Sequence, residues 1–167
     1  MPDHLNYIER TLIDNLRTGT YKTATSTATA WGSDEVKVFG QFPEAEEAEY
    51  PCIIVQMVAN GIEEQFLGMR MGDNERGELY GAAFQIHCIA NSESTLSTGD
   101  GAGYKQRRLL NYMMLAAANI INDCNFVPTS TEVVSRYHTG FKEIGYDPTL
   151  ELYGATTGMI IVFKNDR

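Results

Sequence analysis

The chain has 167 residues, which is enough for one ordinary domain with a single hydrophobic core. Its composition, 43% hydrophobic and 21% charged, is typical of globular proteins and excludes disordered, collagen-like and coiled-coil chains. The formal net charge of -9 disfavours tight binding to the phosphate backbone of nucleic acid or to an anionic membrane.

The N-terminal part predicts a helix followed by extended segments. Over residues 3–17, apolar side chains recur every three or four positions, as on one face of a helix, at Leu5, Ile8, Leu12 and Leu16. Gly19 is expected to end this helix. Residues 18–30 are rich in threonine, which predicts either an exposed strand or a mobile arm. The alternation over Val36–Phe39 predicts a short strand.

An acidic turn separates this strand from a second, more apolar one. The turn runs over Pro43–Glu49, and Tyr50-Pro51 then opens a predicted strand over Cys52–Val58. Proline at the first position of a strand loses no ladder hydrogen bond, so Pro51 marks the boundary of the strand.

The longest strand and the longest helix follow a polar excursion. Residues 61–79 predict a hairpin excursion with a charged, glycine-containing loop. From Tyr80 to Ala90 apolar residues occupy every second position and polar Gln85 and His87 fall between them, which predicts a long, half-buried antiparallel strand. Tyr104–Cys124 follows the 3.6-residue period of a helix long enough to cover a sheet face.

Two final strands complete the predicted fold. They span Glu132–His138 and Ala155–Lys164, and a loop containing Gly140, Gly145 and Pro148 joins them. The last strand is apolar on both faces, which is typical of a central strand. We therefore predict one α+β domain over residues 1–167, in which an N-terminal helix and one long helix pack on one face of a mixed, mainly antiparallel sheet.

The targeting features of the chain are few. No apolar run approaches the roughly 20 residues that a membrane-spanning helix needs, so we expect no membrane association. The first residues lack a secretory signal, so we expect no export by a signal peptide. The odd set of cysteines sits in or beside apolar segments and forms no paired metal motif, which predicts buried, reduced thiols in a cytoplasmic fold at Cys52, Cys88 and Cys124.

A search for catalytic chemistry finds little. His87 and Cys88 are adjacent in a strand and must point to opposite faces, and no nucleophile elbow is present. We therefore predict no enzyme activity, no cofactor and no metal site. The turn Gly99–Gly103, followed by Lys105, Arg107 and Arg108, resembles an anion-binding helix start, but it lacks both the GxGxxG and the GK[ST] pattern. A flexible linker is the favoured interpretation, and a small-molecule or anion-binding module is the alternative function.

Two other groups of residues have an ordinary and a functional interpretation. The first is an acidic set that forms a solvated loop or lines a channel when several copies converge; it comprises Glu44, Glu46, Glu47 and Glu49, with Glu63 and Glu64 as further members. The second is an apolar set within the excursion that packs in its own hairpin or contacts another subunit; it comprises Phe66, Leu67, Met69 and Met71.

Taken in chain order, these elements resemble the tail terminator and tail-completion (neck) proteins of long-tailed bacteriophages. The resemblance covers most of the chain and no single motif in it is diagnostic. It is carried by the helix Leu5–Leu16, the strand Val36–Phe39, the entry Tyr50-Pro51-Cys52-Ile53-Ile54-Val55, the strand Tyr80–Ala90 closing in Ala90-Asn91-Ser92, the helix Tyr104–Cys124 and the final strand pair. Residues 18–30 and 61–79 depart from short members of that family, which leaves open a terminator, a connector-side neck subunit or a related tail component.

The resemblance implies a structural role without catalysis. Subunits of this family commonly form a six-fold ring that caps the tail tube and joins it to the head connector. The implied partners are further copies of the chain, the tail-tube protein and the head-connector protein, with DNA only as non-specific passing cargo. The implied location is the virion, and the host cytoplasm during assembly.

Overall fold

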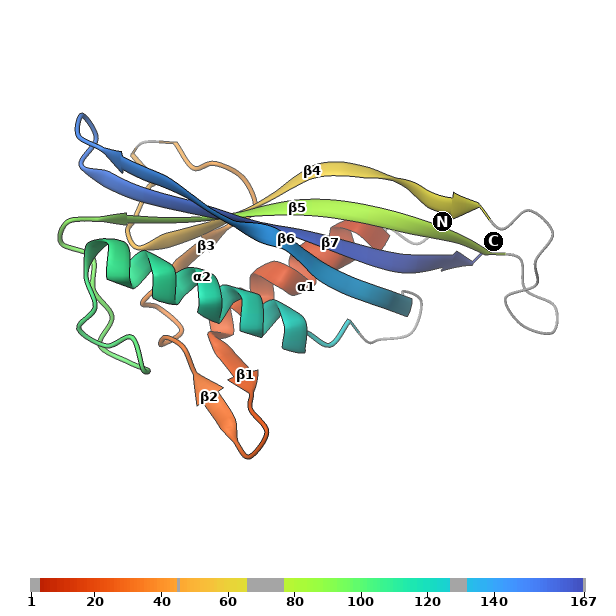
Figure 1. Ribbon diagram of the computed structural model, residues 1–167, viewed down its shortest axis with the longest axis horizontal. Helices are drawn as coiled ribbons and strands as arrows, with labels where there is room; N and C mark the ends of the chain where they lie inside the picture. Colours follow the sequence, from red (N-terminus) through yellow and green to blue (C-terminus); the bar gives the residue numbers. More distant parts are fainter. Residues whose placement is uncertain (1–3, 45, 66–76, 127–131, 167) are drawn as a thin grey trace.

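The structure is a computed structural model that describes residues 4–44, 46–65, 77–126 and 132–166. In this part of the chain it contains two helices and seven strands (Figure 1). In chain order they are α1 (His4–Thr18), β1 (Thr20–Lys22), β2 (Thr27–Thr29), β3 (Lys37–Phe39), β4 (Cys52–Gln65), β5 (Gly77–Asn91), α2 (Gln106–Asp123), β6 (Glu132–Asp147) and β7 (Leu152–Asp166).

The predicted α+β class and mixed, mainly antiparallel sheet are confirmed. The five-stranded sheet has the order β3-β4-β5-β7-β6, in which only the β3–β4 pair is parallel. Strand β7 lies between β5 and β6, so the prediction of a central last strand is also confirmed. Helix α1 packs on β3 and β4, α2 packs on β5 and β7, and the two helices contact each other on the same face of the sheet (Figure 1).

Helix α1 buries the stripe that its sequence predicts. Ile8, Leu12 and Leu16 are fully buried in the core. Gly19 follows the helix with φ +64, in the left-handed region, and a Cβ there would lie 2.5 Å from the carbonyl oxygen of Trp31. The buried Trp31 ring donates from Nε1 to the carbonyl oxygen of Leu16 at 2.9 Å, which ties the helix end to the following segment.

The threonine-rich residues 18–30 form a hairpin, so the strand alternative is the observed one. Strands β1 and β2 pair antiparallel, and the Thr23 hydroxyl accepts from the Ser26 amide at 3.0 Å across their turn. The backbone amide of Lys22 donates to Asp123 Oδ2 at 2.9 Å. That bond links the hairpin to the C-terminal end of α2 (Figure 1).

Strands β4 and β5 are longer than predicted and together form one hairpin. Their antiparallel register runs from Cys52 paired with Ile89 to Gln65 paired with Glu78. The flanks of the predicted excursion at 61–79 therefore belong to the sheet, and residues 66–76 lie outside the described residues. The strands extend well past both helices at the end that carries the ends of β4 and β7 (Figure 1).

The predicted loop between the last two strands is wrong for most of its length. Strand β6 continues through Gly140 and Gly145 to Asp147, and its register with β7 shifts at both glycines. Gly140 has φ +121 and Gly145 has φ +97, so each takes a conformation that side chains disfavour and absorbs a β-bulge. Glycine is typical of both turns and β-bulges, so the sequence pattern does not distinguish them at these positions. Only residues 148–151 form the turn between the two strands.

Helix α2 begins and ends within two residues of the predicted bounds and is capped from the sheet. Its last turn has no basic residue. Arg136 in β6 instead donates from Nη1 to the carbonyl oxygens of Ile121 at 2.9 Å and Cys124 at 2.6 Å. The same guanidinium lies 5.2 Å from the centroid of the Phe126 ring.

The core lies between the helices and the sheet. On β5 the buried positions alternate as predicted, at Ala82, Phe84, Ile86, Cys88 and Ala90. The three cysteines are free and buried, as predicted. Burial raises the pKa of the Cys52 and Cys124 thiols to about 12 and also raises that of Cys88.

Candidate functional site

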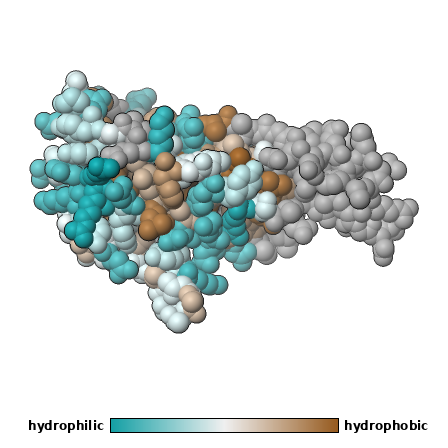
Figure 2. Space-filling view, viewed as in Figure 1, coloured by the Kyte–Doolittle hydropathy of each residue, from teal (hydrophilic) through white to brown (hydrophobic). Residues whose placement is uncertain are grey.

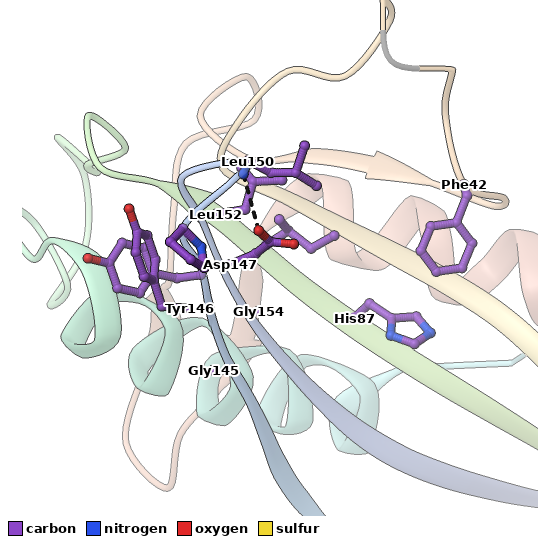
Figure 3. Close-up of a pocket in the computed structure, with 11 residues that line it drawn as sticks. Phe42, His87, Gly145, Tyr146, Asp147, Leu150, Leu152 and Gly154 are labelled. Carbon is purple, nitrogen blue, oxygen red and sulfur yellow. Dashed lines mark hydrogen bonds between the residues drawn. The ribbon is translucent and has the colours of Figure 1, made fainter.

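An open groove lies at one end of the sheet, between the β3–β4 loop and the β6–β7 turn (Figure 3). Its volume is about 660 Å³, within the range of pockets that take small ligands or side chains of a partner. It is lined by Phe42, His87, Ile89, Gly145, Tyr146, Asp147, Pro148, Leu150, Leu152, Tyr153 and Gly154. We call this set the end groove.

The end groove exists because glycine replaces side chains in neighbouring strands. Gly154 of β7 pairs with Ile89 of β5 on one side and with Gly145 of β6 on the other. A Cβ at Gly145 would meet no atom within 4 Å. The space beside Ile89 therefore stays open, because neither β7 at Gly154 nor β6 at Gly145 has a side chain to fill it.

His87 forms part of the floor, on the sheet face opposite the helices, because its neighbour Cys88 points into the core. Its Nδ1 lies 3.0 Å from Thr156 Oγ1 and its Nε2 lies 3.2 Å from Gln56 Oε1. With a carbonyl oxygen facing Nε2, that nitrogen donates to Gln56 and Nδ1 accepts from the Thr156 hydroxyl. Burial lowers the pKa of His87, which favours this neutral form.

The rim of the end groove is apolar and exposed. Phe42 is 54% exposed, Tyr146 is 49% exposed and Leu150 is 64% exposed. The Phe42 ring tilts over His87 with 5.1 Å between the ring centroids, so the β3–β4 loop leans over the floor of the groove (Figure 3). The Asp147 carboxylate accepts from the Leu150 amide at 3.2 Å, which holds the turn that presents Leu150.

The acidic set predicted from the sequence divides into two groups. Four members are exposed in the β3–β4 loop, after Phe42, at Glu44, Glu46, Glu47 and Glu49. Of these, Glu49 lies 3.5 Å from Lys37 in an exposed ion pair. Glu63 and Glu64 lie near the far end of β4, about 35 Å along the strand from its first residue, and their side chains are not among those described. The six glutamates therefore do not form one cluster within a subunit.

The apolar set at Phe66, Leu67, Met69 and Met71 lies outside the described residues.

The glycine turn predicted as an alternative anion site uses its amides internally. Ala102, Gly103 and Tyr104 donate to carbonyl oxygens of residues 96–101 at 2.9–3.1 Å. A Cβ at Gly99 would lie 2.5 Å from the carbonyl oxygen of Ala30, and one at Gly101 would collide with the Tyr112 ring. Close packing thus explains Gly99 and Gly101, and the anion-binding module stays a prediction.

The end groove is not visible in the sequence because its walls come from segments about 100 residues apart. Phe42 precedes the acidic turn, and the β6–β7 turn was predicted as part of a longer loop. The available signal was the spacing of Gly145 and Gly154 around an apolar turn, which becomes informative only when the register of β6 and β7 is known.

The described residues show neither a metal-binding cluster nor a membrane-spanning helix. Among the described residues, no group of three or more His, Cys, Asp or Glu side chains is placed to hold a metal ion. No helix in the described ranges is both long enough and apolar enough to cross a membrane. Searches against models of known protein families and against curated protein sequences find no match.

Proposed function

We propose that the chain is a structural subunit of a long-tailed phage tail, a terminator or neck protein whose copies form a ring between the tail tube and the head connector. The proposal starts from the resemblance of the element order, and the described part of the chain contains each element on which that resemblance depends. In that role the protein works in the virion and meets its partners in the host cytoplasm during assembly.

The observation that carries the proposal is that the two ends of the sheet differ, because the strands extend past the helix layer at one end and an apolar groove rim is exposed at the other (Figure 1). Strands β5 and β7 have 15 residues each, about 50 Å in length. Helix α2 has 18 residues, about 27 Å in length. At one end the strands extend past the helices, and at the other end the apolar rim of the end groove is exposed (Figure 1).

The exposed surface supports an assembly role. Hydrophilic residues cover much of the visible surface around the helices, while hydrophobic residues gather toward the middle of the molecule (Figure 2). Exposed apolar side chains that cluster, as Phe42, Tyr146 and Leu150 do, are typical of surfaces that bind another protein or a ligand, and a subunit contact is the use that this proposal assigns to them. Because the two ends of the sheet differ, a contact between one end and the other is heterologous, and such contacts give a ring when the rotation between copies closes and an open filament when it does not.

The acidic loop fits the passage of DNA through such a ring. Glu44, Glu46 and Glu47 are exposed and follow the rim residue Phe42. Repeated around a channel, they would repel the phosphate backbone and let DNA pass without binding. DNA is then a non-specific cargo rather than a ligand.

The test is the mass and shape of the assembly. We expect native mass spectrometry and negative-stain electron microscopy to show rings, either for the purified chain or after it is mixed with tail tubes from the phage that encodes it. A chain that stays monomeric in both preparations contradicts the proposal. Neighbouring genes for a portal, connector or tail-tube protein would support the assignment to a tail.

A further inference from the structure

We infer that the end groove binds residues 66–76 of a neighbouring copy, the segment that joins β4 to β5. The inference rests on the proposed ring and names the two surfaces that meet in it. It uses the chemistry of the described groove together with the amino-acid sequence of the segment.

The end groove selects an apolar segment that carries a cation. Its floor has no charged side chain, because Ile89, Leu152 and neutral His87 form it. Its two walls carry exposed acids that are close to the apolar rim. These acids are Glu44, Glu46 and Glu47 in the β3–β4 loop, and Asp147 and Glu151 at the β6–β7 turn.

Residues 66–76 have the complementary composition. The segment begins Phe66-Leu67-Gly68-Met69-Arg70-Met71, with four large apolar residues around one arginine. Methionine side chains adapt to irregular surfaces, which suits an interface that must form between separately folded copies. Asp73 and Glu75 follow in the same segment with Arg76 beside them, so the net charge is positive in its first half and negative in its second.

A copy cannot fill its own groove. Ile89 in the groove and Gly77 at the start of β5 are twelve residues apart in one extended strand, about 40 Å. The ends of β4 and β5 that lead to residues 66–76 lie at the end of the sheet opposite the β6–β7 turn (Figure 1). The segment therefore reaches a groove only in another molecule, and this end-to-end contact is heterologous, the kind that builds a ring when the rotation between copies closes.

The edges of the sheet are less suited to join copies. Edge strand β6 has register shifts at Val133/Ser135, His138/Gly140 and Glu143/Gly145. At the other edge β3 pairs only with Cys52–Ile54, and the remainder of β4 has shifts at Met57/Ala59 and Ile62/Glu64. Bulges twist an edge strand away from the straight geometry that edge-to-edge pairing requires. The end-to-end contact is therefore favoured over continuation of the sheet between copies.

Disulfide trapping tests the inference. Leu150→Cys puts a thiol on the exposed rim, and Met69→Cys puts one in the proposed occupant. The three native cysteines are buried with raised pKa values, so they should stay unreactive. The matched control pairs Met69→Cys with Thr25→Cys, an exposed residue in the β1–β2 turn.

We expect mild oxidation of the Leu150→Cys/Met69→Cys chain to give a ladder of disulfide-linked oligomers, at least tenfold more than the control chain gives. Mixing the two single variants should give only a linked dimer between them. If rings form but the ladder is absent or equals that of the control, the inference is wrong and the proposed function stands. If the chain forms no oligomer either by itself or with tail tubes, both are wrong.

Discussion

Replacing Arg136 tests whether the sheet caps the long helix. The Arg136 guanidinium donates to two carbonyl oxygens at the end of α2, those of Ile121 and Cys124. Carbonyl groups at a helix C-terminus carry partial negative charge, and the Ile121 carbonyl also accepts from the Cys124 amide at 3.2 Å. Arg136→Met keeps much of the aliphatic length of the side chain but removes both hydrogen bonds and the positive charge.

The expected loss follows from these contacts. Hydrogen bonds from a charged donor contribute about 1.5–3 kcal/mol, and a cation at a helix C-terminus contributes about 0.3–1 kcal/mol. Arg136 is only partly buried, so water replaces some of the lost interaction. We therefore expect Arg136→Met to lower the free energy of unfolding by about 2 kcal/mol. Arg136→Lys keeps the charge but not the planar fork, and should lose about half of that amount.

Urea denaturation followed by circular dichroism measures these differences in the free energy of unfolding. The control is Arg10→Met, which removes the same charge from an 84% exposed side chain that lies 3.8 Å from Asp14. Such an exposed ion pair contributes about 0.5 kcal/mol or less. The reasoning is refuted if Arg136→Met and Arg10→Met destabilise the protein equally, or if Arg136→Lys is as harmful as Arg136→Met.

Two further substitutions test the core. Burial lowers the pKa of His138, and the nearby backbone of Ala118 offsets part of this shift. Neither ring nitrogen of His138 makes a hydrogen bond of normal geometry. The unfolded chain therefore binds a proton at His138 more readily than the folded chain, so the stability of the protein should fall as the pH drops below about 6.5. Thermal unfolding should show a less steep fall for His138→Phe. Gly101→Ala should lower the free energy of unfolding, measured in urea, by about 1–3 kcal/mol because the new methyl group displaces the Tyr112 ring. Gly32→Ala should lower it little, and an equal loss for the two variants would contradict the packing argument.

The elements with strict periodicity were predictable from the sequence. Strand β5 buries every second residue from Ala82 to Ala90, and α2 buries the apolar face that its 3.6-residue period indicates. Both patterns arise because one face of each element packs on the same core, so the order of apolar and polar residues predicts which side chains are buried. The positions of α1 and of the short strand β3 followed from the same signal.

The longer strands and the end groove were not predictable because they depend on pairing across the sheet. The predicted strand ended at Val58 and residues 61–79 were predicted as an excursion, yet the ladder of β4 with β5 continues to Gln65. Glycine predicts a turn and a bulge equally well, so Gly145 was assigned to a loop. The end groove needs that bulge together with Phe42, about 100 residues away, and no local pattern carries such information.

The charge of the chain limits how its copies can meet. Each copy has a formal net charge of -9, so copies repel one another once their surfaces approach within roughly one Debye length, about 8 Å at physiological salt, and salt screens the repulsion at larger separations. Contacts that form under this repulsion must be short-range, which favours apolar surfaces over distant charge pairs. The end groove meets that requirement, because its rim is apolar while its acids remain exposed beside it. In the proposed ring the same acids would repel the phosphate backbone of DNA. The acidic residues would thus both favour a partner segment that carries a cation and let DNA pass without binding.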